Sequence, residues 1–150
     1  MKRIASFEVD HDKIGVGMYI SRIDDEIITY DVRMVIPNGG KYLSGASMHT
    51  IEHLFATYAR NRYESNIIYV GPMGCKTGFY LIQRGLSHTQ AIELVKDAFR
   101  YIRDFDGEIP GATRKECGNY LYHDLAQAKK DVCELLDVLT NYSEENLSYN

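Results

Sequence analysis

The sequence has few cysteines, few prolines and no long apolar run, and each shortage excludes a class of protein. Its 150 residues include only 3 Cys and 3 Pro, with 12 Gly, so collagen and proline-rich disordered chains are excluded. Cys75, Cys117 and Cys133 are odd in number and form no CxxC pair, which argues against a disulfide framework. In a reducing compartment such thiols are core residues, metal ligands or catalysts.

Targeting segments and large fields of charge are also missing. No run reaches the roughly 20 apolar residues that cross a bilayer. Acidic Glu8 and Asp10 fall where a signal peptide needs apolar residues, and neither end has a lipidation pattern. The net charge is −4, which repels nucleic acid. We expect a cytoplasmic protein that binds neither membranes nor nucleic acid.

The composition that remains is that of a globular protein, with 45% hydrophobic and 25% charged residues. No linker, repeat or low-complexity block divides the chain, so we predict one domain over residues 1–150. Strands are expected at 14–23 and 26–36, around a turn at Asp24 and Asp25. A helix is expected from one of the serines at 44–47 to about Tyr63.

The second half continues the mixed order of strands and helices. Strands are expected at 67–70 and 78–83, with a tight turn between them over residues 71–75. Ser87 and Gln90 form a capping box at the start of a helix that runs to about Asp104. A last helix is expected from about Leu121 to Leu139, and the polar tail after it is expected to fray. We predict an α+β fold, a small antiparallel sheet covered by helices.

Residues 49–53 read His-Thr-Ile-Glu-His, which is the strongest chemical signal in the chain. Two histidines four residues apart leave the same face of a helix and are able to grip one metal ion. Glu52 between them stands where a general base belongs. A catalytic site wants a third protein ligand and an open position; Cys117 and Cys75 are the candidates.

The three cysteines and the remaining histidines carry different expectations. Cys117 lies at a loop-to-helix junction, where a thiolate is exposed enough to coordinate. Cys75, on its tight turn, is a ligand, a nucleophile or a proton carrier. Cys133 is expected in the core of the last helix. His123 is expected to make a structural hydrogen bond beside Asp124.

Five motifs follow one another along nearly the whole chain. They are Ser6-Phe7 with Asp10-His11; Tyr30-Asp31-Val32-Arg33 with Pro37-Asn38; His49 to Leu54; Pro72-Met73-Gly74-Cys75 with Thr77-Gly78; and Glu116-Cys117-Gly118-Asn119 with His123-Asp124-Leu125. HxxEH alone is shared with unrelated metallopeptidases, whereas five ordered motifs are hard to obtain by chance. Taken together, they resemble the LuxS family of S-ribosylhomocysteine lyases.

The resemblance implies one divalent metal ion per subunit, held by His49, His53 and Cys117, and no organic cofactor. Iron(II) is the ion expected from the family, and zinc or cobalt suits the same ligands. The implied reaction cleaves S-ribosylhomocysteine to homocysteine and 4,5-dihydroxy-2,3-pentanedione, the precursor of autoinducer-2. Cys75 is expected to move protons in the early isomerisation steps, and Glu52 in the later step and the elimination.

The resemblance also implies a homodimer with active sites at the subunit interface, where Ser6, His11 and Arg33 contribute to the substrate pocket. Arg33 is expected to pair with a carboxylate or to steady Cys75 as a thiolate. From the residues alone, each has an ordinary structural alternative. Ser6 is equally a turn hydroxyl, His11 a surface histidine and Arg33 a strand-edge cation.

One departure from the family and two other functions stay open. Many members have an acidic residue and then a serine before Pro-Met-Gly-Cys, whereas this chain has Tyr69 and Gly71 there. A metallopeptidase of the HxxEH type shares the helix and the glutamate, but such enzymes are far larger and a cysteine ligand is atypical of them. A metal-binding module without turnover would have no need of Cys75.

Overall fold

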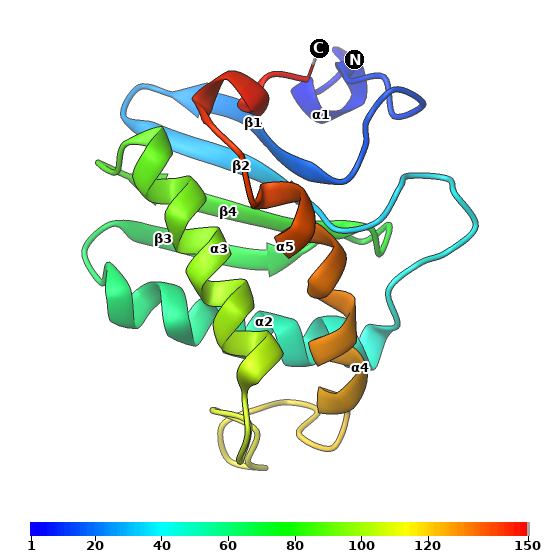
Figure 1. The fold of residues 1–150 in the computed structure, drawn as a ribbon, viewed down its shortest axis with the longest axis vertical. Coiled ribbons are helices and arrows are strands. Elements are labelled where there is room, and N and C mark those ends of the chain that lie inside the picture. Colours follow the sequence, from blue (N-terminus) through cyan, green and yellow to red (C-terminus); the bar gives the residue numbers. More distant parts are fainter. Residues whose placement is uncertain (150) are drawn as a thin grey trace.

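The computed structural model describes residues 1–149. Four antiparallel strands form one sheet in the order β1-β2-β4-β3, and the helices pack mainly against one of its faces (Figure 1). This confirms the predicted α+β fold. Along the chain the elements are α1 (Ala5–Glu8), β1 (Gly17–Asp24), β2 (Ile27–Arg33), α2 (Gly45–Arg62), β3 (Ile67–Pro72), β4 (Gly78–Arg84), α3 (His88–Asp104), α4 (Leu125–Asp131), α5 (Cys133–Leu139) and the 3₁₀ helix η1 (Glu144–Leu147).

The sheet contains the four predicted strands, with β1 and β2 shorter than predicted and β3 and β4 slightly longer. The hairpin between β1 and β2 turns at Asp25, which has φ +56°, a conformation that Asp tolerates better than most residues. β1 begins three residues later than predicted, and β2 ends at Arg33, before Pro37. β4 inserts between β2 and β3, and a bulge interrupts the pairing of β3 between Ile67 and Tyr69.

The two long helices begin at the predicted caps. The Ser44 hydroxyl accepts from the N–H of Ser47 at 3.1 Å and starts α2. Ser87 and Gln90 form the capping box of α3. The apolar faces of both helices are buried against the sheet, where Phe55 contacts Phe79 and Phe99 edge to face. One continuous core therefore joins β2, β4, α2 and α3.

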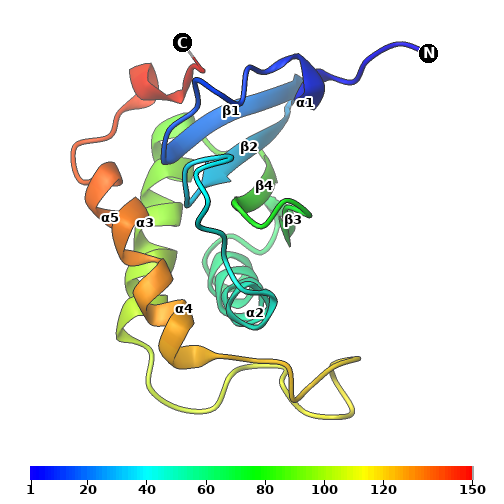
Figure 2. The ribbon, with the colours of Figure 1, turned by 90° about the vertical axis from the view of Figure 1, so that its right-hand side faces the viewer.

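Figure 2 shows the two layers from the side, with α3, α4 and α5 on one side of the sheet and α2 below it. The loop from 105 to 124 runs from α3 to α4 past the end of α2 (Figures 1 and 2). Register places Tyr19, Asp31 and Tyr80 in one row across three strands. Because side chains alternate along a strand, this row lies on the opposite face from buried Tyr30 and Val32 of β2.

The C-terminal part corrects three predictions. The predicted helix from 121 to 139 is two short helices, and it starts at Leu125 because Asp124 is the residue whose carboxylate caps the first turn, accepting from the N–H of Gln127 at 3.0 Å. Cys133 is half-buried rather than in the core, and its thiol donates to the carbonyl of Lys129. The tail does not fray, because it contains η1 and Leu147 is fully buried.

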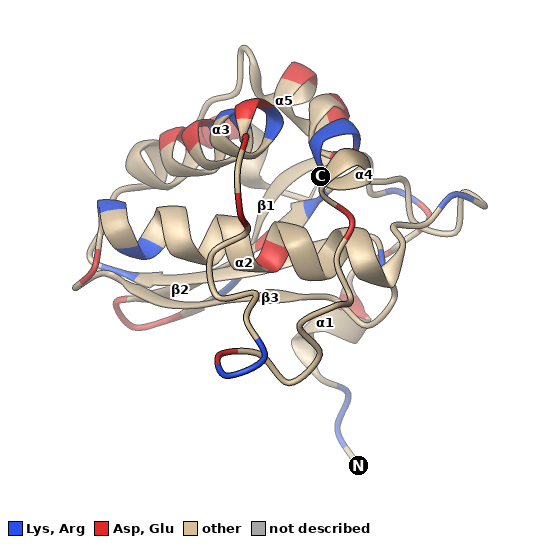
Figure 3. Cartoon of the chain, turned by 90° about the horizontal axis from the view of Figure 1, so that it is seen from below, with Lys and Arg blue, Asp and Glu red and all other residues tan. Residues whose placement is uncertain are grey.

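Charged residues of both signs are interspersed on α3 and on the α4–α5 segment (Figure 3). A short helix, α1, forms where no element was predicted, and none of its residues is buried. Within residues 1–149, every helix is too short or too polar to cross a bilayer.

Candidate active site

His49 and His53 lie one turn apart on α2, on the side that faces away from the core. Ile51, Leu54 and Phe55 of the same helix are fully buried, so the helical period directs both imidazoles outward. Their ring centroids lie 4.7 Å apart with the planes nearly perpendicular. The predicted spacing therefore brings the two rings to one place.

Cys117 reaches this place from the loop between α3 and α4. Its N–H donates to the carbonyl of Thr113 at 3.0 Å, and its Sγ accepts from the N–H of Asn119 at 3.4 Å. The Sγ atom lies 3.4 Å from Nε2 of His49. Residues 68 positions apart in the chain thus meet at one point.

The cluster has a fourth member that was predicted only as structural. Donor atoms of His49, His53, Cys117 and His123 all lie within 4.8 Å of one another, as in a group that is able to hold a metal ion. His123 does make the hydrogen bond expected of it, to Thr50 Oγ1 at 3.0 Å. The signal for its second role is its position, six residues after Cys117 and just before the cap of α4.

Each histidine of the cluster is oriented through its Nδ1 atom. His49 Nδ1 lies 2.5 Å from the carbonyl of Tyr122, and His53 Nδ1 lies 2.9 Å from that of Pro110. A carbonyl only accepts, so both Nδ1 atoms carry the proton and both Nε2 atoms carry the lone pair. This arrangement is typical of histidines that bind metal.

Thr50 fixes the tautomer of His123 in the same way. Its hydroxyl proton is donated to the carbonyl of Ala46 at 3.1 Å, and its oxygen accepts from the N–H of Asp124 at 3.0 Å. His123 Nδ1 must therefore donate to Thr50, which leaves a lone pair on Nε2. That atom is buried and has no hydrogen-bond partner within the described residues.

His123 differs from the other two histidines in the direction of its ring. It stacks on His49 with centroids 4.0 Å apart and an interplanar angle of 14°. The in-plane lone pairs of two parallel rings run side by side and do not converge on one ion. Burial, with the neighbouring His49 and His53, lowers the pKa of His123 to about 4, so its ring is neutral at pH 7.

Glu52 lines two hollows on either side of the cluster. One, of about 350 Å³, is also lined by His53 and Tyr69. The other, of about 360 Å³, is also lined by His49 and by Gly74. The carboxylate is half-buried, so it stands where it is able to exchange protons with a molecule in either hollow.

Cys75 lies on a loop that the rest of the fold holds in place. The N–H of Met73 donates to the carbonyl of Gly78 at 2.9 Å, and the N–H of Leu43 donates to that of Lys76 at 2.9 Å. Lys76 has φ +62°, which makes the turn tight. Gly74 and Lys76, on either side of Cys75, line the same hollow as His49 and Glu52, and the thiol residue itself is exposed.

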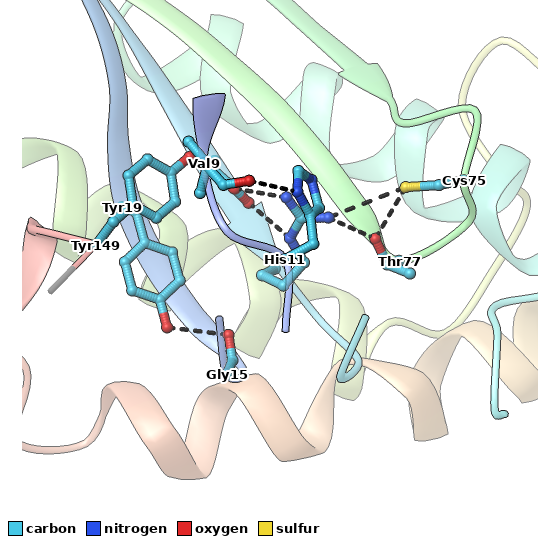
Figure 4. Close-up of polar contacts among 9 residues, drawn as sticks. Val9, His11, Gly15, Tyr19, Cys75, Thr77 and Tyr149 are labelled. Atoms are coloured by element: carbon cyan, nitrogen blue, oxygen red, sulfur yellow. Dashed lines mark hydrogen bonds and ion pairs between the residues drawn. The ribbon is translucent and has the colours of Figure 1, made fainter. Parts of the chain in front are cut away.

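Arg33 pairs with a carboxylate, as one of the two expectations had it, and it also lies beside Cys75. Its guanidinium forms a two-pronged ion pair with Asp31, with Nε–Oδ1 at 3.0 Å and Nη2–Oδ2 at 2.6 Å. Its Nη1 donates to Thr77 Oγ1 at 2.7 Å and lies 3.9 Å from Cys75 Sγ (Figure 4). Burial opposes the charge of Arg33, but the hydrogen bonds and charge of Asp31 outweigh it and raise the pKa of Arg33. The cation is permanent.

Comparison with known proteins identifies the family to which the chain belongs. The sequence model described as S-Ribosylhomocysteinase (LuxS) matches residues 4–146. The chain belongs to the LuxS family. Among curated LuxS relatives, the S-ribosylhomocysteine lyase of Phocaeicola vulgatus is 45% identical and aligns over 99% of this chain and 98% of its own. Those of Finegoldia magna and Porphyromonas gingivalis are 43% and 45% identical, over 99% of both chains.

The family resemblance read from the five motifs is thus confirmed, and the His and Cys cluster fits a metal-dependent LuxS. The structure does not join every residue expected in the LuxS pocket to that cluster. Ser6, on α1, lines a separate hollow with Tyr69 and Tyr80. His11, in the N-terminal segment, has its Nδ1 atom 2.9 Å from the carbonyl of Val9 (Figure 4).

Tyr69 stands between the His and Cys cluster and the hollow of Ser6. It lines the hollow of Glu52 and His53 as well as the hollow of Ser6, and about half of it is exposed (51%). The departure from the family pattern at this position therefore places a phenol ring beside the cluster.

Proposed function

We propose that this LuxS protein is an S-ribosylhomocysteine lyase, a carbon–sulfur lyase that releases homocysteine and 4,5-dihydroxy-2,3-pentanedione. One observation carries the proposal. His49 of the His and Cys cluster lines one hollow together with Glu52 and with Gly74 and Lys76, the two neighbours of Cys75. A metal site and two proton carriers thus border the space in which one small molecule would lie.

The metal ligands proposed are His49, His53 and Cys117. Two imidazole nitrogens and one thiolate suit a divalent transition metal, and both Nε2 atoms are held with the lone pair toward the cluster. His123 is left out because its ring is parallel to that of His49. We propose iron(II) as the native ion and no organic cofactor.

A bound divalent ion supplies Lewis-acid polarisation of the oxygens of the sugar. The chain supplies the proton transfers. A thioether leaves by elimination only when it stands beta to a carbonyl, so the carbonyl must first move from C1 of the opened ribose to C2 and then to C3. Each move takes a proton from the carbon that becomes the new carbonyl and returns one to the carbon that loses it.

Cys75 is proposed to move the proton in the early isomerisation. The permanently charged guanidinium of Arg33 lies 3.9 Å from its Sγ and Thr77 Oγ1 lies 3.0 Å from it, so a cation and a hydroxyl stand beside the sulfur that exchanges the proton. Glu52 is proposed to serve the later isomerisation and the elimination. In the elimination it takes the proton from C4, a double bond forms between C4 and C5, and the C5–S bond breaks to leave homocysteine.

The deciding experiment follows free thiol in an anaerobic mixture of the iron- or cobalt-loaded protein with S-ribosylhomocysteine. We expect thiol release from the wild type and a loss of at least about a hundredfold in Glu52→Gln, with metal content unchanged. Glu93→Gln, on the exposed surface of α3, is the matched control. Bound metal with no thiol release by the wild type would contradict the lyase and favour a metal-binding module. Peptide cleavage that needs Glu52 would point to a peptidase.

We propose that the active unit is a homodimer formed through the face of the sheet opposite the helices. Exposed apolar side chains lie on that face and on α1, with Tyr69 51% and Phe7 62% exposed. Ser6 lies on the same side. Phe7→Asp should give a monomer by analytical ultracentrifugation and should abolish thiol release. A fully active monomer would contradict the shared site.

We also propose that the protein works in the cytoplasm, where thiols stay reduced. Cys75, Cys117 and Cys133 are all free. The proposed roles of Cys75 and Cys117 require a thiolate, which a disulfide would remove.

A further inference from the structure

The C-terminal tail, residues 141–149, returns to the sheet and docks on β1. The Tyr142 hydroxyl donates to the carbonyl of Met18 at 2.7 Å and accepts from its N–H at 3.0 Å. Leu147 is fully buried. At the end of the tail, Tyr149 stacks on Tyr19 with centroids 5.0 Å apart and planes within 16°. The last side chain of the described chain is thus held in a defined place.

The hydroxyl of Tyr149 meets a buried charge there. It donates to Asp31 Oδ2 at 2.8 Å, and Asp31 is only 1% exposed. The same oxygen accepts from Arg33 Nη2 at 2.6 Å. A carboxylate withdrawn from water is costly unless its lone pairs are filled, so Tyr149 and Arg33 share the task of satisfying Asp31.

Arg33 connects this carboxylate to the exposed thiol. While Nε and Nη2 face Asp31, Nη1 faces Thr77 Oγ1 at 2.7 Å and Cys75 Sγ at 3.9 Å. Thr77 Oγ1 in turn lies 3.0 Å from Cys75 Sγ. A chain of contacts therefore runs from the end of the tail to the proposed proton carrier. Figure 4 labels its ends, Tyr149 on one side and Thr77 with Cys75 on the other.

We propose that Tyr149 is a positioning residue for Cys75: through the shared carboxylate of Asp31 it keeps the Arg33 guanidinium turned toward Thr77 and the thiol. Without the phenol, Asp31 Oδ2 has only Arg33 to satisfy it. The guanidinium is then drawn further onto the carboxylate and away from Cys75, which lowers the fraction of thiolate. The inference rests on the proposed role of Cys75.

Several other groups face this network, and each contributes to the electrostatics of the thiol. The carboxylate of Asp31 opposes the thiolate, and the Arg33 cation favours it. The titratable groups around the pair are Tyr19 on β1, Tyr80 on β4, Lys76 beside Cys75, His11 in the N-terminal segment and Tyr149 in the tail. All of them except Tyr149 are retained in the variant that tests the proposal.

The test uses Tyr149→Phe, which keeps the ring on Tyr19 and removes only the hydroxyl. The rate of alkylation of Cys75 by iodoacetamide is followed against pH in the metal-loaded protein, with mass spectrometry to separate Cys75 from the other thiols. We expect the midpoint of the pH profile to rise by about half a unit, which is a roughly threefold lower rate at pH 7. The kcat for thiol release should fall by a similar factor with less change in KM.

Tyr101→Phe, on α3, is the matched control and should leave the profile unchanged. An unchanged midpoint in Tyr149→Phe overturns the proposal, and so does lower activity without a shift of the midpoint, because that result assigns Tyr149 to stability alone. The alkylation profile needs no turnover. Failure of the lyase function itself would appear separately, as a wild-type protein that releases no homocysteine.

Discussion

The ring of Tyr69 lies directly against Gly71, two residues further along the same face of β3. A β-carbon placed at Gly71 would come within 2.2 Å of the Tyr69 hydroxyl and 2.3 Å of its ring. The phenol therefore occupies space that a side chain at position 71 would need. The two departures from the family pattern, tyrosine for an acidic residue and glycine for serine, are sterically one change.

Gly71→Ser should therefore move the Tyr69 ring out of its place. The ring is half exposed and free to swing, so we expect a change of about 1 kcal/mol or less in the free energy of unfolding. Opening the hollow beside Glu52 should change KM for S-ribosylhomocysteine several-fold at unchanged metal content, as steady-state kinetics would measure. Gly15→Ser, where the new β-carbon comes no closer than 4.0 Å to another side chain, is the control. If Tyr69→Ala leaves KM unchanged, the Tyr69 ring is not the cause of the change in Gly71→Ser.

The two cysteines near the site should separate in metal analysis. Cys117→Ala should lose the metal, because it removes one of three proposed ligands. Cys75→Ala should keep the metal but lose turnover by about a hundredfold or more. Elemental analysis and thiol release on the purified variants measure the two effects. Cys133→Ala should change neither, since its thiol donates to a backbone carbonyl. Loss of metal from Cys75→Ala instead would mean that the roles are exchanged.

His123→Asn tests whether the fourth histidine of the cluster binds the ion. Because its ring is stacked parallel to His49, the variant should retain about one equivalent of metal, with affinity weakened by roughly tenfold or less. The visible spectrum of the cobalt(II) form, which reports coordination number, should keep its intensity. Complete metal loss, as expected for Cys117→Ala, would instead make His123 a ligand.

The tail should loosen at alkaline pH. Burial raises the pKa of Tyr142 to about 12, and burial with the charge of Asp31 raises that of Tyr149. Between pH 10 and pH 12 the unfolded chain has lost these protons while the folded chain keeps them, so stability falls as pH rises. Denaturant titrations at several pH values give the free energy of unfolding as a function of pH. Its fall with pH should be shallower in Tyr142→Phe by at most about 1.4 kcal/mol per pH unit. An unchanged slope would contradict the buried, neutral phenol.

Local sequence was sufficient to predict the structure wherever an interaction between near neighbours sets the backbone conformation. The capping box of Ser87 and Gln90, the cap at Ser44 and the turn at Asp25 all lie where the sequence placed them, because each involves residues within three positions. The same holds for His49 and His53, whose meeting follows from the helical period alone. The family was readable too, because its motifs are contiguous and ordered.

Contacts between segments far apart in the chain could not be predicted from local sequence. The last predicted helix is shorter at its start and split, and the tail that looked too polar to pack is docked on β1 by Tyr142 and Leu147. The position of His123, six residues after Cys117, does not by itself place it in the metal cluster. Its position depends on Thr50, 73 residues earlier, whose hydroxyl fixes the ring.

The amino-acid sequence by itself determined the α+β class, the two long helices, the histidine pair with its glutamate, and the LuxS family. The residues alone left Cys117 and Cys75 open as the third ligand, and the family resemblance named Cys117. Only the tertiary structure showed that Cys117 and His123 meet that pair, that Arg33 is buried on Asp31 beside Cys75, and that Tyr149 completes the same network. The physical reason is the separation along the chain of the residues that interact. Caps and helical faces are set by neighbours in the chain, whereas a site built from a helix, a loop and a tail exists only once the core has brought them together.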